Sequence, residues 1–173
     1  MHGDAAPPDA LTLRTRSRWL VRLAWLLGLL LVVSVVGYVT THPDELPTTD
    51  TVVTASTPAG RTVFLGVFTA TADFDRSIRI SGVKVFATAP GAVTIVPHLC
   101  RGGSLGVTTD PTLFCTELEP TEGATMTAGD EIVLEVVGET PGTVTIDRVR
   151  VAYRENLRWA TQRAGEPAVV TIL

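Results

Sequence analysis

The chain has 173 residues, a formal net charge of −4 and a hydrophobic content of 45%. A chain of this length supplies one domain with a hydrophobic core and a shorter additional segment. The acidic balance argues against a nucleic-acid partner, because binding to a polyanion depends on clustered positive charge.

A long apolar segment near the N-terminus is the first element along the chain. Its uncharged run begins at Leu23 and ends at Val39, and these seventeen residues form a helix about 26 Å long at the usual rise. Trp19 and Arg22 precede the run, where an interfacial aromatic ring and a snorkelling arginine extend the membrane-compatible surface. The segment therefore predicts a single transmembrane helix over residues 19–39, in contact with the lipid bilayer.

The charges on either side of this segment predict its orientation. Four arginines lie at or before position 22, whereas Asp44 and Glu45 are the first carboxylates after the run. By the positive-inside rule, residues 1–18 form a cytoplasmic tail, and the chain after the helix lies outside the cell membrane. Low apolar content and Pro7-Pro8 predict that this tail is disordered. A cleaved signal peptide is the alternative for the apolar segment, and it exports the same C-terminal part.

Residues 40–50 contain Pro43 and Pro47 and predict a short extended stalk. From residue 51 onward, short β-branched runs alternate with Gly, Pro and Asp, and no amphipathic helix is evident. This pattern predicts an all-β extracytoplasmic domain over residues 51–173, an antiparallel β-sandwich of immunoglobulin-like type, with a small closed barrel as the alternative. The predicted strands are 51–56, 62–71, 77–87, 92–99, 105–108, 124–127, 131–137, 143–153 and 168–173.

Two of these strands share a shift in their apolar alternation. In 77–87 the shift falls near Ser81-Gly82, and in 143–153 it falls near Asp147-Arg148. One extra residue between two alternating runs is typical of a β-bulge, so the sequence predicts two bulges. The residues predicted to face the core are Ile78, Ile80, Val83, Val85, Val144, Ile146, Val149 and Val151.

The chain has two cysteines, Cys100 and Cys115. Outside the membrane the compartment is oxidising, so an even number at modest separation predicts a disulfide between them. A copper site built on His98, the two cysteines and Met126 is the alternative, but the domain lacks the second histidine that such a site uses. We therefore expect neither a metal nor another cofactor.

No motif predicts catalysis. The glycine-rich stretch at 101–106 lacks the Lys-Ser/Thr ending of a phosphate loop, and no G-x-S-x-G nucleophile elbow occurs. Pairs of acidic residues near turns leave a glycosidase-like reaction as an alternative. We expect a protein that is not an enzyme, with no catalytic residues to name.

Charge is unevenly distributed in the C-terminal half. Residues 102–146 contain eight acidic and no basic residues, and five arginines then follow within sixteen residues. A solvated outer face is one interpretation of these arginines, and a recognition surface with an aromatic anchor is the other. The candidate partner surface comprises Arg148, Arg150, Arg154, Arg158 and Trp159.

The stretch from 149 to 165 resembles the closing strand and turn of small, singly anchored extracytoplasmic proteins of unknown function from high-GC actinobacteria. Those proteins often end in V-x-V-x-Y-R-x-G-L-R-x-G-T-Q, and this chain has Asn156 and Ala160 in place of the two glycines. The resemblance covers under a fifth of the chain and implies an envelope location without implying a reaction. The matching residues are Val149, Val151, Tyr153, Arg154, Leu157, Arg158, Thr161 and Gln162.

Together these features predict a single-pass cell-membrane protein with a cytoplasmic N-terminus. We expect its outer domain to act as a non-enzymatic accessory that binds another envelope or membrane protein. The alternative is a ligand-binding or sensing domain for envelope glycans, peptides or small molecules, which requires a pocket with converging polar groups.

Overall fold

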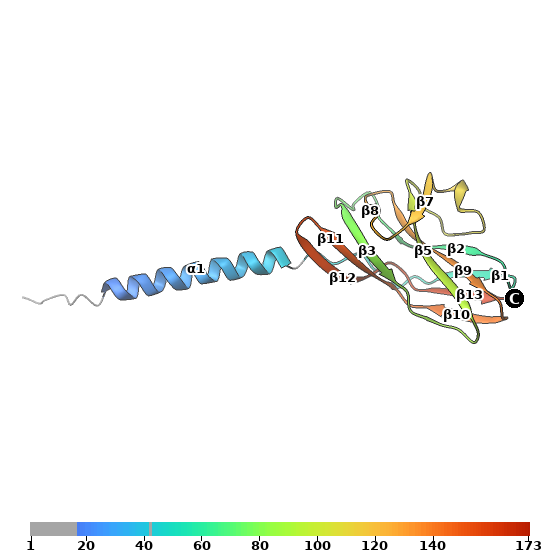
Figure 1. Ribbon diagram of the computed structural model, residues 1–173, viewed down its shortest axis with the longest axis horizontal. Coiled ribbons are helices and arrows are strands. Elements are labelled where there is room, and N and C mark those ends of the chain that lie inside the picture. Colours follow the sequence, from blue (N-terminus) through green and yellow to red (C-terminus); the bar gives the residue numbers. More distant parts are fainter. Residues whose placement is uncertain (1–16, 42) are drawn as a thin grey trace, which may run out of the picture. The chain divides into compact units, whose positions relative to one another are not determined.

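The computed structural model describes residues 17–41 and 43–173 and forms two compact units, Met1–Val39 and Thr40–Leu173 (Figure 1). Residues 1–16, most of the predicted cytoplasmic tail, lie outside the described residues.

Helix α1 (Ser17–Thr41) contains the predicted transmembrane segment. Its apolar part, Trp19–Tyr38, has 20 residues and a mean hydropathy of 2.4, and none of it is buried against the rest of the chain. Twenty residues rise by about 30 Å, the thickness of a hydrocarbon core. By length and composition the helix therefore fits either a membrane anchor or a signal sequence.

The second unit consists of strands arranged in three sheets (Figure 1). The sheet orders are β1-β13-β10-β4, β12-β11-β3-β8 and β6-β2-β9-β5-β7, and every pairing is antiparallel except that of β1 with β13. The strands are β1 (Val53–Thr57), β2 (Val63–Thr69), β3 (Ile78–Lys84), β4 (Ala87–Thr88), β5 (Val93–Arg101), β6 (Val107–Thr108), β7 (Glu117–Pro120), β8 (Thr125–Met126), β9 (Glu131–Gly138), β10 (Gly142–Ile146), β11 (Val149–Glu155), β12 (Arg158–Ala164) and β13 (Ala168–Ile172), with one 3-10 helix, η1 (Pro111–Leu113).

The bulge predicted near Ser81-Gly82 is confirmed. Tyr153 of β11 faces Ile80 and Ala152 faces Gly82, so Ser81 is the extra residue between them. The predicted strand 77–87 nevertheless forms two elements, because β3 pairs with β11 while β4 pairs with β10 in another sheet.

The bulge predicted near Asp147-Arg148 is wrong, because the chain leaves one sheet there and joins another. Strand β10 lies between β13 and β4, and strand β11 lies between β12 and β3. A change of sheet and a bulge both shift the alternation of buried residues by one position, so their sequence patterns coincide.

The structure contains two strands that the sequence did not predict, β7 and β12. Both lie at the edge of a sheet. The inward positions of β12 hold Arg158, Ala160, Gln162 and Ala164, which give no apolar alternation. An edge strand with small and polar inward residues is therefore difficult to predict, because its sequence lacks the apolar alternation of a strand.

The core is built largely from residues that the alternation predicts. Six of the eight predicted core residues are buried, and Val83 and Val85 are half-buried and pack against the core. Strand β9, in the middle of its sheet, is buried along most of its length. Tyr153 is among the largest fully buried side chains and lies close to the turn of the hairpin formed by β11 and β12.

Residues 43–50, hereafter the linking segment, cover most of the predicted stalk and lie against the β-sheet domain. Leu46 is 4% exposed and belongs to the core cluster. Thr48 forms a parallel bridge with Gly165, and two backbone hydrogen bonds flank the bridge, from Thr49 N to Gly165 O (3.2 Å) and from Gly165 N to Pro47 O (2.8 Å). The first two residues of the predicted stalk belong to α1.

Candidate functional site

The sheet formed by β12, β11 and β3 has a strongly basic outer face. In β11 the buried residues Val149, Val151 and Tyr153 alternate with residues that point away from the core. The same alternation in the two neighbouring strands exposes their basic residues on the same side. We call this set the basic face: Arg79, Lys84, Arg150, Arg154 and Arg163.

Strand register places these cations opposite one another. Arg150 faces Arg163 on one side and Lys84 on the other, so three cations form one row across the sheet. Such neighbours lie with their Cβ atoms about 5 Å apart, and like charges in this arrangement are unfavourable. A second row contains Trp159, Arg154 and Arg79.

Two aromatic rings accompany the cations. Lys84 Nζ lies 4.9 Å and the Arg150 guanidinium 5.2 Å from the centre of the Phe86 ring. The Arg154 guanidinium lies 5.6 Å from the centre of the Trp159 ring, which is 65% exposed. These contacts hold the cations by their interaction with the rings and leave the charges facing solvent.

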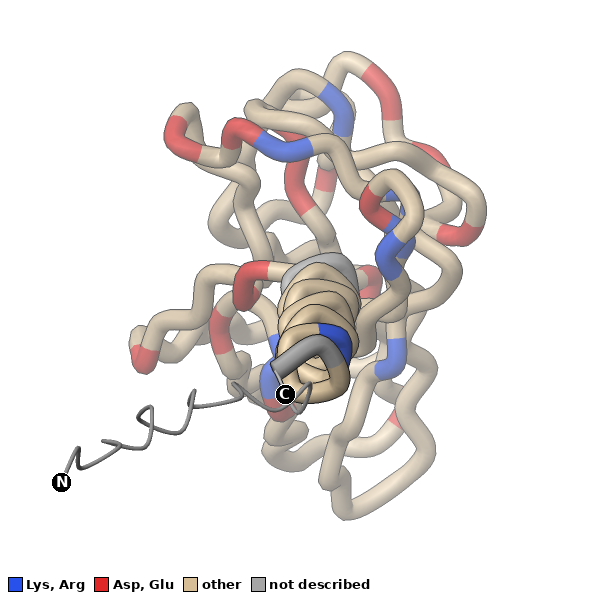
Figure 2. The backbone as a smooth tube through the Cα atoms, turned by 90° about the vertical axis from the view of Figure 1, so that its left-hand side faces the viewer, with Lys and Arg blue, Asp and Glu red and all other residues tan. Residues whose placement is uncertain are grey.

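Carboxylates do not neutralise the basic face. In the described part of the chain, the ion pairs of the β-sheet domain involve Arg76, His98, Arg101 and Arg148, and none involves a residue of the basic face. Arg154 Nε donates to Asn156 O at 2.6 Å, a neutral partner. Figure 2 shows that acidic and basic positions are distributed over the backbone of the whole domain.

A shallow cleft opens at one end of the basic face. Its volume is about 240 Å³, and its lining includes Phe86, Arg150 and Arg163, with Asp147 as the one acidic residue. The guanidinium groups of three arginines, Arg148, Arg150 and Arg163, line this cleft beside the Phe86 ring. Such groups bind carboxylate or phosphate oxygens well, because each guanidinium donates two parallel hydrogen bonds.

Three residues of the predicted partner surface lie on the outer face of this sheet, Arg148 lines the cleft at its end, and Arg158 faces the other side. Arg150, Arg154 and Trp159 share the outer face. Arg148 precedes β11 and binds the linking segment, donating to Thr49 O at 2.7 and 3.1 Å and pairing with Asp50. Arg158 is half-buried and points to the opposite side from its neighbour Trp159, because successive residues of a strand face opposite sides.

Four residues of this surface are absent from the predicted set: Arg79, Lys84, Phe86 and Arg163. The alternation of 77–87 already places Arg79 and Lys84 opposite the core residues Ile78 and Val83. That signal was present in the sequence. The pairing of β3 with β11 makes the two groups of cations neighbours, and this pairing could not be predicted from the sequence.

The predicted disulfide is confirmed. Cys100 and Cys115 are joined, with their Cα atoms 5.2 Å apart, and both are buried. The adjacent Arg101 pairs with Glu119 at 2.5 Å and with the buried Asp130 at 2.8 Å. The disulfide and these ion pairs fix the end of β5 against β7 and the start of β9.

Glu131 is a buried carboxylate beside a second cavity, of about 380 Å³. It accepts hydrogen bonds from Leu105 N (2.6 Å), Thr69 Oγ1 (2.6 Å) and Ser104 Oγ (3.3 Å). Burial raises the pKa of Glu131, and these three hydrogen bonds oppose that shift only in part. Among the described residues that line this cavity, Glu131 is the most deeply buried carboxylate, and its hydrogen-bond partners are all neutral.

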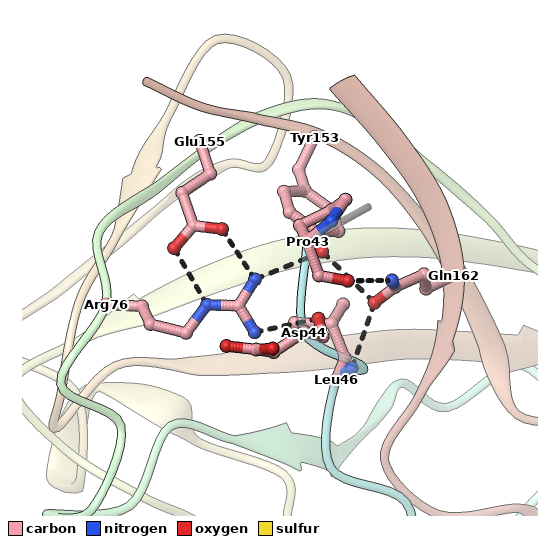
Figure 3. A network of polar contacts seen from close by, with 7 residues as sticks. All are labelled: Pro43, Asp44, Leu46, Arg76, Tyr153, Glu155 and Gln162. Carbon is pink, nitrogen blue, oxygen red and sulfur yellow. Dashed lines mark hydrogen bonds and ion pairs between the residues drawn. The ribbon is translucent and has the colours of Figure 1, made fainter. Parts of the chain in front are cut away.

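A polar network joins the linking segment to the hairpin of β11 and β12 (Figure 3). Arg76 donates to both Glu155 oxygens at 2.8 and 2.9 Å, to Tyr153 Oη at 3.2 Å and to Asp44 O at 3.0 Å. Gln162 accepts from Leu46 N at 2.9 Å and donates to Pro43 O at 3.4 Å. The hydrogen bond to Glu155 raises the pKa of Arg76, and burial raises the pKa of Tyr153.

His98, a residue of the alternative copper site, lies beside Glu135, with Nε2 2.8 Å from a carboxylate oxygen. Over the described residues, no three side chains of His, Cys, Asp or Glu lie close enough together to hold a metal ion. Among the pairs of acidic residues near turns, Asp130 and Glu131 have separate hydrogen-bond partners, whereas Asp73 and Asp75 line one cavity.

Comparisons of the chain with protein-family models, with curated proteins and with solved structures found no match. The resemblance to anchored actinobacterial proteins therefore stays a prediction. The fold and the surface define a β-sheet domain that has a basic, aromatic outer face and follows an apolar helix.

Proposed function

We propose that the chain is a membrane-anchored, extracytoplasmic and non-enzymatic binding module, whose basic face contacts an acidic partner protein of the cell envelope. The observation that carries this proposal is the basic face itself: five cations on one sheet, with two aromatic rings in contact with them and without ion pairs to carboxylates among the described residues. Arginine and aromatic residues are enriched in protein interfaces and dominate their energetics. An acidic partner would relieve the repulsion within the row of three cations.

The proposed domain class is an immunoglobulin-like sandwich, and the strand order supports it. The order β2-β9-β5 corresponds to strands B, E and D of that fold. Strands G, F and C correspond to two sets of strands in two sheets, β13-β10-β4 and β12-β11-β3. The parallel pairing of β1 with β13 places the first strand beside the last.

The proposed location outside the membrane rests on the arginines before α1 and on the disulfide. Arginines at positions 14, 16, 18 and 22 favour a cytoplasmic N-terminus. A disulfide persists in an oxidising compartment, in keeping with a domain on the outer side.

Charge reversal tests the contact. We expect Arg150→Glu with Arg163→Glu to reduce the amount of partner co-purified after crosslinking in intact cells by more than about tenfold, because close interfacial charge pairs contribute several kcal/mol. Arg61→Glu is the matched control, since Arg61 is exposed and lies in the turn between β1 and β2. Equal recovery from the double variant and the control contradicts the proposal.

A ligand-binding or sensing role is the second candidate, and the cavity beside Glu131 favours it. At about 380 Å³ it lies within the usual range for small-molecule sites, roughly 300–1,000 Å³, whereas the cleft beside Phe86 is smaller. Glycans, peptides and small molecules of the envelope are the candidate ligands. Saturable stabilisation of the purified protein by one of them, lost in Glu131→Gln, would support this role.

A further inference from the structure

The turn between β11 and β12 exposes two large apolar side chains. Leu157 is 87% exposed, the highest value for a large hydrophobic residue in the described chain, and Trp159 is 65% exposed. Asn156 adopts a positive φ of 54° and closes the turn, so the exposed residues sit on a tight hairpin. We call residues 154–159 the hairpin tip.

The path of the linking segment shows which end of the domain carries this tip. The bridge between Thr48 and Gly165 is parallel, so lower residue numbers in the linking segment correspond to lower numbers in β12. Pro43 and Leu46 accordingly contact Gln162, three residues before Gly165 (Figure 3). The linking segment therefore starts on the side of the domain where β12 begins, which is the side of the hairpin tip.

The linking segment follows α1 closely along the chain. Helix α1 ends at Thr41, and Pro43 follows two residues later. Two Cα–Cα steps span at most about 8 Å. The interfacial layer on each side of a bilayer is about 5–8 Å thick. A helix that crosses the membrane therefore keeps the start of the linking segment close to the lipid headgroups.

We propose that the hairpin tip docks on the phospholipid surface of the membrane that holds α1. Leu157 and Trp159 enter the interfacial layer, and Arg158, which is not part of the basic face, contacts lipid phosphates. Trp is the residue most typical of this layer, and arginine binds phosphate through paired N–H groups. The inference rests on the retention of α1 as an anchor, which is part of the proposed function.

Apolar insertion is the main contribution to this docking. The acidic residues Asp44, Glu45, Asp73 and Asp75 line a cavity with Arg76 beside the linking segment, so this end of the domain is not basic overall. Docking therefore depends little on the content of anionic lipid. A weak contact is sufficient, because the tether holds the tip at a high local concentration near the bilayer.

A probe on the tip tests the proposal in the full-length chain. Both native cysteines are joined in the disulfide, so Leu157→Cys provides a single thiol for an environment-sensitive fluorophore. In phosphatidylcholine liposomes with spin-labelled lipid, we expect a blue-shifted spectrum and loss of most of the fluorescence through quenching. Leu173→Cys is the matched control, because Leu173 is 67% exposed at the C-terminus, and we expect no quenching there.

Adding Trp159→Ser to the Leu157→Cys protein should reduce the quenching, and adding anionic lipid should change it little. Equal, weak quenching at both positions would overturn the proposal, and so would quenching that appears only with anionic lipid. The liposomes contain no other protein, so a negative result in liposomes does not contradict the proposed contact of the basic face with a partner protein. Loss of that contact in cells likewise does not contradict the result with lipid.

Discussion

At the scale of single residues, Glu131 is the group with the clearest predicted dependence on pH. It is 2% exposed, and its hydrogen-bond partners are neutral donors. Burial raises the pKa of Glu131 above its ordinary value of 4.5, so the folded chain binds this proton more readily than the unfolded chain does. Its stabilising contribution is complete below pH 4.5 and is lost as the pH rises through the raised pKa.

We expect Glu131→Gln to remove this dependence, because glutamine keeps an oxygen acceptor for Leu105 N and does not titrate. The free energy of unfolding is measured by urea denaturation in detergent. As the pH rises from 5 to 8, its value for the variant should increase relative to its value for the wild type. Glu122→Gln is an exposed control that should show no such gain. A constant difference between wild type and Glu131→Gln at all pH values would contradict the assignment.

Gly66 has the tightest surroundings near this carboxylate. An added Cβ would collide with Leu105 O and with the Glu131 carboxylate. We expect Gly66→Ala to lower the free energy of unfolding by about 1–3 kcal/mol, the usual cost of overpacking. Gly106→Ala, where nothing lies within 4 Å, should change it by less than about 0.5 kcal/mol in the same denaturation experiment. Equal effects at both positions would show that the steric argument is wrong.

At the scale of elements, the sequence predicts strands with apolar alternation and misses strands without it. The alternation of 78–84 and 149–153 identifies β3 and β11 together with their inward residues. Strand β12 is not visible, because its inward positions mix small and polar residues: Ala160 packs against the core, whereas Gln162 hydrogen-bonds to the linking segment. The change of sheet at Asp147-Arg148 is also not visible, because local alternation carries no information about pairing partners.

The disulfide is the covalent constraint on the β5–β7 region. We expect replacement of Cys100 and Cys115 by serine to lower the free energy of unfolding by about 3 kcal/mol, from the loss of loop-closure entropy in a 15-residue separation. Urea denaturation of the wild type with and without a reducing agent should give a similar difference. An effect of reduction that persists in the double serine variant would point to another cause.

The network around Arg76 fixes the linking segment to the domain. Arg76→Ala leaves Glu155 without its bidentate partner and frees Asp44 O, so we expect a loss of about 3 kcal/mol and faster amide exchange in residues 43–49. Arg79→Ala is the control, because Arg79 is exposed and makes no ion pair in the described chain. Unchanged exchange in Arg76→Ala would mean that Leu46 and the bridge to Gly165 hold the segment alone.

At the scale of the whole molecule, an apolar helix precedes a β-sheet domain with one cationic face. The sequence predicts the helix, the disulfide and the part of the surface on β11, since each depends on local composition or alternation. The row of Arg163, Arg150 and Lys84 depends on strands paired across large sequence separations. The fixed linking segment depends on such contacts too, so neither feature follows from local pattern.

Site-specific photocrosslinking in intact cells is the most direct test of the proposed contact. A photoreactive phenylalanine analogue at Thr161, which lies between Trp159 and Arg163 on the exposed side of β12, should form a protein adduct. The adduct should disappear with Arg150→Glu and Arg163→Glu, and the analogue at the exposed Thr54 of β1 should give none. An adduct at Thr161 that survives the charge reversal, or no protein adduct at that position, would contradict the account.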